Sequence, residues 1–297
     1  MKRLSYILLL SIALAGCTTN PPQPQSLIVE GWIDADGYPT VLIHKSYVFA
    51  GADTAATTIE EIAEDLLIPV GKVVVSDGED EVILTGRLDT AYLPPYTYSS
   101  LNMVGQVGKQ YTVTVTYKDF YATATTTIPP IAHLDSICVR SATDRMDVRA
   151  FMRIDEADAD SYYALFARKY GTKQFRFCPL CVFEGTDANN GILEMKVTNP
   201  VSDSEELYGL NYYFKKDSAI PDSLQEYQLK IARIDYTSYQ FWKAYNEQVV
   251  TSGILFVPVY KNVPSNVSGG WGYFSGMGSS MYRFNTAKDT TYQFGGW

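Results

Sequence analysis

The sequence predicts a mainly β protein with two β-sandwich domains of the immunoglobulin-like or transthyretin-like kind, each with one short helix. Three observations lead to this expectation. The chain contains 23 Tyr, which lie beside Val and Thr in short runs and so favour strands. Turn signals separate these runs at intervals typical of sandwiches. A length of 297 residues approaches the upper limit of one hydrophobic core, so two domains are expected.

The first residues have the features of an export signal. Two basic residues, Lys2 and Arg3, precede an apolar run that ends at residue 14 and is too short to span a bilayer. The sequence LAGC at positions 14–17 resembles the lipobox of bacterial lipoproteins. This resemblance implies that residues 1–16 are a signal peptide, that cleavage occurs before Cys17, and that the Cys17 thiol is acylated.

Residues 17–26 are expected to be the lipidated cysteine and a flexible tether. The segment after Cys17 carries three prolines and no apolar run, so it cannot bury enough surface to fold. Extended, it would reach roughly 25 to 30 Å from the membrane. Loss of the two basic residues with the signal takes the formal net charge from −9 to −11. An acidic domain without a basic stripe is repelled by phosphate backbones, which excludes nucleic acid as a partner.

Residues 27–129 are expected to form the N-terminal sandwich. The segments 27–33 and 38–46 flank a DADG turn and predict a hairpin, and residues 72–86 predict a second hairpin around Asp77-Gly78. Strict alternation of Tyr and Val with Thr over 111–117 predicts a half-buried strand that returns after Lys118-Asp119. Between the first two hairpins, Ile59, Ile62 and Leu66 have helical spacing and predict a short surface helix.

Pro129-Pro130 is the expected boundary, because neither proline can donate to a sheet, and residues 130–297 are expected to form the β-rich C-terminal domain. Six segments have strand-like patterns: 135–141, 146–154, 161–170, 191–198, 207–214 and 226–234. A helix is expected near 237–250, where Thr237 and Gln240 have the spacing of a capping box. Its apolar face consists of Tyr239, Trp242, Tyr245 and Val249, and we expect this face to pack in a core.

The order of several motifs resembles the DUF4249 family of Bacteroidetes lipoproteins. These motifs are LIVEGWI, KVVVSDGEDEVIL, GKQYTVTV, SYQFWKAYNEQ and the closing YKNVPSNVSGGWGYFSG. The chain departs from the family pattern around Pro264 and in a long tail after Gly278. The resemblance implies an outer-membrane lipoprotein found with TonB-dependent receptors, which makes such a receptor an expected partner. It supplies no catalytic residues.

The glycine-rich segment near residue 270 is not expected to bind a nucleotide. The spacing from Gly270 and Gly272 places a serine where a third glycine should be, and no βαβ unit surrounds it. The glycines instead let the backbone pass close to another segment. The neighbouring aromatic residues then either pack inside or form a contact surface; they are Trp271, Tyr273 and Phe274.

Three cysteines follow Cys17, an odd number for an oxidising compartment. Cys178 and Cys181, in the sequence CPLC, are candidates for a disulfide that leaves Cys138 free. The alternative is a zinc site in which His133 joins the three cysteines. A thioredoxin-like role lacks the βαβ setting it requires.

Other patterns indicate little chemistry. The acidic run DEADADS at 155–161 lacks the glycine of an EF-hand and reads as a solvated loop, with calcium binding as the alternative. Six Asp-Ser or Asp-Thr tripeptides resemble a bacterial O-glycosylation sequence. With two histidines and no hydrolase signature, we expect no catalytic residues, metal or cofactor.

Three functions remain open from the sequence. The first is a non-catalytic, lipid-anchored outer-membrane protein, on either face of that membrane, that assists a TonB-dependent transporter in nutrient capture or surface assembly. The second is a structural or adhesive surface protein with tandem sandwiches. The third is a glycan-active enzyme with paired carboxylates. The sequence does not identify a ligand for any of the three.

Overall fold

The computed structural model describes residues 25–46, 66–92, 94–143, 145–200, 212–215, 221–222, 225–252 and 263–295. The expected signal peptide, Cys17, nearly all of the tether and all but the last residue of the expected 59–66 helix lie outside these ranges. Within the described residues the protein is mainly β, as the sequence predicts, and its strands form three sheets. No helix in this part of the chain is long and apolar enough to cross a membrane.

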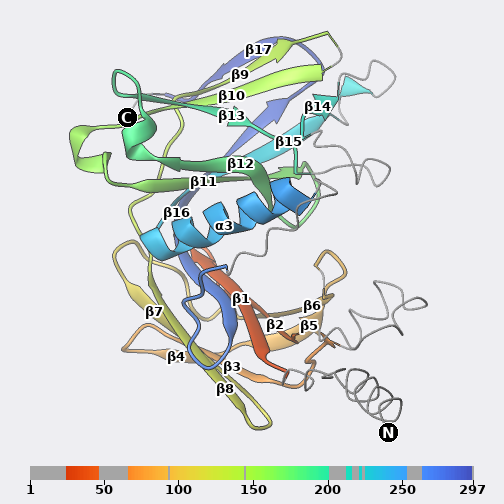
Figure 1. Cartoon of the computed structure of the whole chain (residues 1–297), viewed down its shortest axis with the longest axis vertical. Helices are drawn as coiled ribbons and strands as arrows, with labels where there is room; N and C mark the ends of the chain where they lie inside the picture. Colours follow the sequence, from red (N-terminus) through yellow and green to blue (C-terminus); the bar gives the residue numbers. More distant parts are fainter. Residues whose placement is uncertain are drawn as a thin grey trace, which may run out of the picture.

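The largest sheet has eight strands and runs through the whole molecule. Its order is β12 (Arg176–Glu184), β11 (Tyr162–Lys169), β15 (Glu226–Ile234), β16 (Trp271–Asn285), β1 (Leu27–Asp34), β2 (Thr40–Lys45), β6 (Tyr96–Ser99) and β5 (Thr85–Leu88). Figure 1 shows the long β16 passing from the upper half of the molecule to the lower half.

Two smaller sheets complete the two sandwiches. A four-stranded sheet in the order β4 (Glu81–Ile83), β3 (Lys72–Ser76), β7 (Gln110–Tyr117) and β8 (Phe120–Thr127) faces the β1 end of the large sheet. The other contains β13 (Ile192–Val197), β10 (Arg145–Arg153), β9 (Ser136–Ser141) and β17 (Thr290–Gln293), with β14 (Phe214–Lys215) beside β10. Two short 3₁₀ turns, Glu156–Asp158 and Gly185–Asp187, lie at the ends of strands.

The hairpins predicted for the first sandwich are confirmed. β1 pairs with β2, β3 with β4, and β7 with β8, whose register puts Tyr117 opposite Phe120 across a two-residue turn. Tyr111, Val113 and Val115 of β7 are buried and Tyr117 is partly buried, because the two faces of a strand meet different environments. The strands expected from 135–141, 146–154, 161–170, 191–198 and 226–234 also form.

β16 belongs to both sandwiches, although its residues are at the end of the sequence. Its first half, 271–277, pairs in parallel with β1, and its second half, 278–285, pairs antiparallel with β15. Val267 and Phe274 lie in the core of the first sandwich, whereas Phe284 lies in the core of the second. Residues after Pro129-Pro130 therefore do not all belong to the second sandwich, because the first half of β16 is part of the first.

Glycines allow β16 to pass this closely. Gly272 has φ +121° and sits so near β1 that a Cβ there would lie 1.9 Å from the carbonyl oxygen of Val29. At Gly278 a Cβ would lie 2.2 Å from the carbonyl oxygen of Pro130. The glycine-rich segment is thus a strand whose backbone passes so close to neighbouring backbone that only glycine fits at these positions.

The helix expected near 237–250 is α3 (Tyr236–Ser252), which lies across the middle of the molecule (Figure 1). The predicted capping box is wrong, because the cap is Asp235. Its Oδ1 accepts the backbone N–H of Ser238 at 2.7 Å and so satisfies one of the first free N–H groups. Tyr239 and Trp242 are buried against the large sheet, as predicted, whereas Tyr245 on the same face is 42% exposed and the side chain of Val249 lies outside the described residues.

Candidate functional site

A large cleft lies on the outward face of the large sheet, beside α3, where that sheet passes from one sandwich to the other. Its volume is about 770 Å³, within the usual range for ligand pockets. Ten of its 24 described lining residues are aromatic, against 13% of the chain. They are Trp32, Tyr92, Phe166, Phe175, Phe177, Tyr212, Phe241, Trp242, Tyr245 and Tyr273.

Strand alternation explains why these side chains reach the cleft. In β1 the side chains at odd positions are buried, and those at even positions are only partly buried. Glu30, Trp32 and Asp34 therefore share the outward face. The parallel register places Tyr273 of β16 beside Glu30 and Met277 beside Asp34. Rigid, hydrogen-bonded strands thus fix this wall of the cleft.

α3 supplies the second wall through aromatic packing. The ring of Trp242 stacks on that of Phe177, with 4.6 Å between centroids, and meets Phe166 edge to face at 5.3 Å. Phe241 packs on Tyr273 at 4.4 Å. Such pairs are stabilising beyond the area they bury, so the helix holds its cleft-lining rings in fixed positions.

A buried ion pair forms part of the cleft wall. Lys230 of β15 is 4% exposed, and its Nζ donates to both carboxylate oxygens of Asp34 at 3.1 and 3.2 Å. The same ammonium lies 3.5 Å from the sulfur of Met277 and 5.0 Å from the ring centre of Phe166. Ser279 also donates its hydroxyl to Asp34 Oδ1 at 2.6 Å. This charge pair is fully engaged within the protein.

Four tyrosines in the cleft have raised pKa values, and for Tyr212 the cause is burial. Burial is the main cause for Tyr273, whose pKa lies well above 10.0, and the Glu30 carboxylate is the next. The pKa of Tyr245 is raised by the same two causes in the same order. For Tyr92, burial and then the Asp89 carboxylate raise the pKa. These phenols remain neutral hydrogen-bonding groups at physiological pH.

The contact residues expected from the sequence have three different positions. Tyr273 lines the cleft, and Trp271 is 56% exposed. Phe274 is fully buried in the core of the first sandwich, because it points to the opposite face of β16 from Tyr273. Phe274 is therefore a core residue and not part of a contact surface.

The three described cysteines are free thiols. Cys178 and Cys181 lie in β12, a strand that the sequence patterns did not predict, and both are fully buried. Burial raises the pKa of Cys178 well above 9.0. The zinc alternative does not form, since no group of three or more His, Cys, Asp or Glu side chains suited to a metal occurs in the described part of the chain.

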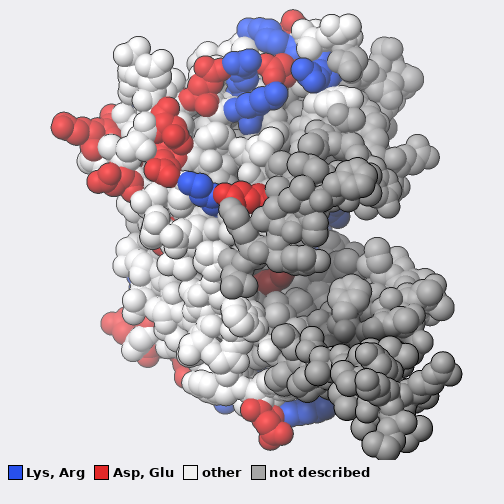
Figure 2. All heavy atoms as spheres, in the orientation of Figure 1, with Lys and Arg blue, Asp and Glu red and all other residues white. Residues whose placement is uncertain are grey.

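The acidic run at 155–161 forms an exposed surface on the 3₁₀ turn before β11, and its red atoms are visible at the upper left of Figure 2. Asp158 pairs with Arg233 at 2.7 Å, whereas Asp155, Glu156 and Asp160 are exposed. The solvated-loop interpretation fits this arrangement.

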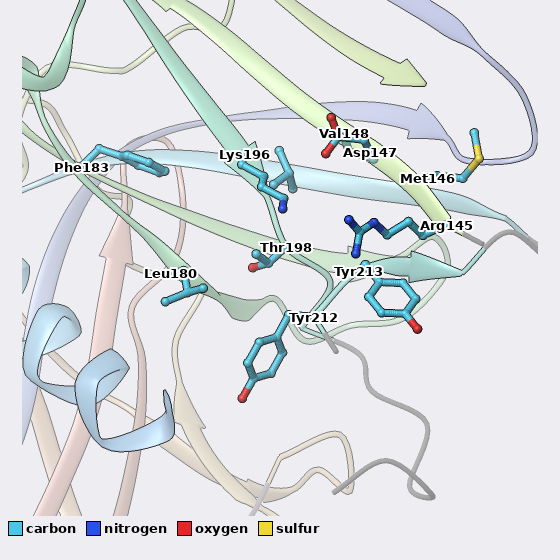
Figure 3. Close-up of a pocket in the computed structure, with 11 residues that line it drawn as sticks. Arg145, Met146, Asp147, Val148, Leu180, Phe183, Lys196, Thr198, Tyr212 and Tyr213 are labelled. Atoms are coloured by element: carbon cyan, nitrogen blue, oxygen red, sulfur yellow. The ribbon is translucent and has the colours of Figure 1, made fainter. Parts of the chain in front are cut away.

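A second, smaller pocket of about 210 Å³ lies at the edge of the second sandwich (Figure 3). It is lined by residues of β10, β12 and β13 with Tyr212 and Tyr213. Arg145 lies over the Tyr213 ring, 5.6 Å from its centre, so its guanidinium already has an aromatic partner. The larger cleft, with room for a drug-sized or disaccharide-sized ligand, is the stronger candidate site.

Most of the cleft was not predicted from the sequence. Glu30 and Trp32 were read only as parts of a strand, although a carboxylate and an indole on the outward face of a strand are a usable signal. A second usable signal is Lys230, a charged residue inside the apolar run QLKIARI. What the sequence lacked was their proximity, since residues 32, 92, 175 and 241 come from separate parts of the chain.

The family model described as "Domain of unknown function (DUF4249)" matches residues 18–283. No match was found among curated proteins.

Proposed function

The chain belongs to the DUF4249 family, and we propose that it is a non-catalytic binding protein that holds a ligand in the aromatic cleft and assists a TonB-dependent transporter. In this proposal, acylated Cys17 anchors it to the outer membrane and the tether holds the sandwiches clear of the lipid. The observation that carries the proposal is the cleft itself.

The cleft has the properties of a binding site. It combines aromatic faces with a few polar groups, which is the usual composition of ligand pockets. The ion pair in the cleft wall favours binding over nucleophilic chemistry. The Lys230 amine is a protonated ammonium that donates to both oxygens of Asp34, so its nitrogen has no lone pair with which to attack a substrate. Helix α3 and strand β16 are rigid elements, which lowers the entropy cost of binding.

The location and company of the protein are tested by extraction from membranes. We expect the full chain to sediment with outer membranes and a Cys17→Ala variant to be released into the soluble fraction. After solubilisation in mild detergent, a TonB-dependent receptor identified by mass spectrometry should co-purify with the wild type in stoichiometric amount. A chain that is membrane-bound but carries no receptor would support the structural or adhesive role instead.

The binding role is tested on the same purified protein. Small molecules released on denaturation are compared by mass spectrometry between the wild type and a Phe241→Ala variant, which loses a cleft ring packed on Tyr273. The matched control is Trp271→Ala, an exposed aromatic on β16 that does not line the cleft. A compound lost in the first variant and kept in the second supports the proposal. An identical profile in all three proteins refutes it, and turnover of a bound glycan would favour the enzyme.

A further inference from the structure

Two carboxylates lie on the outward face of β1 with Trp32 between them, and among the described residues only Asp34 is paired with a lysine or arginine. Asp34 is neutralised by the Lys230 ammonium. Glu30 lies four residues earlier on the same face, and its side chain is 39% exposed. Among the described residues, the nearest basic group to Glu30 is the imidazole of His44, with Nε2 3.9 Å from Oε1.

Aromatic residues lie near Glu30 on the outward face of the sheet. The strand register places Tyr273 directly beside Glu30 on one side and Leu42 on the other. Trp32 follows on the same face, about 7 Å along the strand, and its ring centre lies 6.1 Å from that of Tyr92. Burial raises the pKa values of Tyr245 and Tyr273, and the negative charge of Glu30 raises them further.

The neighbouring ion pair shows how this cleft holds a cation. The Lys230 ammonium contacts one carboxylate and lies over two rings, with its Nζ 5.0 Å from the centre of Phe166 and 5.5 Å from that of Phe175. Arg168 is likewise placed 4.1 Å over Phe175. A carboxylate combined with ring faces is the arrangement that stabilises alkylammonium groups. Glu30 lines the same cleft as Trp32, Tyr245 and Tyr273, and in the described part of the chain no lysine or arginine pairs with it.

We propose that Glu30 and the aromatic residues near it form a subsite for an alkylammonium group of the ligand. This inference rests on the proposed binding role of the cleft and names the class of ligand. The remaining aromatic wall, near Phe175 and Phe241, takes the apolar part of the same ligand. The competing outcome is a neutral ligand whose hydroxyl groups donate hydrogen bonds to Glu30, because a carboxylate also accepts hydrogen bonds from hydroxyl groups.

The test uses two probes of the same shape and different charge, choline and 3,3-dimethylbutan-1-ol. Both are titrated into the full chain in non-ionic detergent, and binding is measured by calorimetry and tryptophan fluorescence. We expect choline to bind at least about tenfold more tightly than the neutral alcohol, in line with the strength of a partly desolvated cation–π contact. Glu30→Gln should remove this preference and leave the affinity for the alcohol unchanged.

The matched control is Glu194→Gln, an exposed carboxylate on β13 that pairs with Arg149 far from the cleft, and it should alter neither affinity. Melting curves show whether each variant folds, and Trp32→Leu provides a second, charge-neutral test that should weaken choline binding. Equal affinities for the two probes, absence of choline binding, or a Glu30→Gln variant that binds choline like the wild type would each overturn the inference. The binding role itself fails separately, through an unchanged small-molecule profile in Phe241→Ala.

Discussion

The ion pair between Lys230 and Asp34 should be a major determinant of stability, because it links strands of the two sandwiches. β15 and β1 are not hydrogen-bonded to each other, since β16 lies between them. The pair crosses β16 and is almost removed from water, with Lys230 4% exposed. The decisive perturbation is Asp34→Asn, which leaves a buried ammonium without a carboxylate.

The expected cost of Asp34→Asn follows from the environment of the ammonium. Breaking a buried pair by removing one partner costs about 3 to 5 kcal/mol. The Asp34 side chain is 20% exposed, and its replacement amide can still accept the Ser279 hydroxyl, so we expect the low end, about 3 kcal/mol. A double variant that also carries Lys230→Met removes the unpaired ammonium and fills its space with an apolar side chain. This double variant should lose only about 1 kcal/mol.

Urea denaturation measures both free energies of unfolding, with tryptophan fluorescence and circular dichroism recorded in parallel. A loss of about 3 kcal/mol corresponds to a fall in melting temperature of roughly 6 to 12 °C for a chain of this size. The double-mutant cycle should then give a coupling of at least about 2 kcal/mol. A cost below about 1 kcal/mol for Asp34→Asn, or a double variant less stable than this single one, would show that the pair behaves like a surface ion pair.

Three further substitutions test other parts of the fold. The pKa of Asp77 is lowered to about 2, chiefly by the hydrogen bond from Lys109. Because this pKa is below the value of 3.8 in the unfolded chain, the ionised Asp77 stabilises the folded state. This stabilisation is complete above pH 4 and is lost as the pH falls toward 2. Asp77→Asn should flatten the stability profile in that window, and an unchanged acid limb would contradict this. Trp242→Ala should cost about 3 to 5 kcal/mol by urea denaturation, and a cost under about 1 kcal/mol would mean that α3 is not docked. Gly272→Ala should prevent close pairing with Val29 and weaken hydrogen-exchange protection in β1 and β16, whereas Gly295→Ala, which has open space, should not.

The sequence predicts the hairpins well because their signals are local. In β7 the alternation of Tyr and Val with Thr and the two-residue turn after Tyr117 specify the strand, its buried face and its partner together. β12 was missed because the CPLC segment contains a proline and resembles a loop. Its Leu180 has φ +66°, an irregularity that the strand accommodates with a shift of register against β11.

β16 was missed for a different physical reason. Its glycines weaken the strand pattern, and the close approach to Val29 and Pro130 that requires them is a contact between distant parts of the chain. The parallel pairing with β1 joins residues about 240 positions apart, which no local pattern can indicate. The cleft was missed with it, because Glu30 and Tyr273 become neighbours only through this pairing.

The bridging strand also determines how the cleft can select a ligand. One continuous strand belongs to both sandwiches, and the Lys230 and Asp34 pair crosses it, so hinge motion between the two halves would break backbone hydrogen bonds and a buried ion pair. Closure of the cleft by hinge motion therefore has a high free-energy cost, and the cleft has a largely fixed width and charge pattern. Selectivity must then come from what fits a preformed surface. On that surface the register of β1 and β16 places the partly buried Glu30 carboxylate beside Tyr273, so the strand that unites the two sandwiches also positions the charge that we propose binds the ligand.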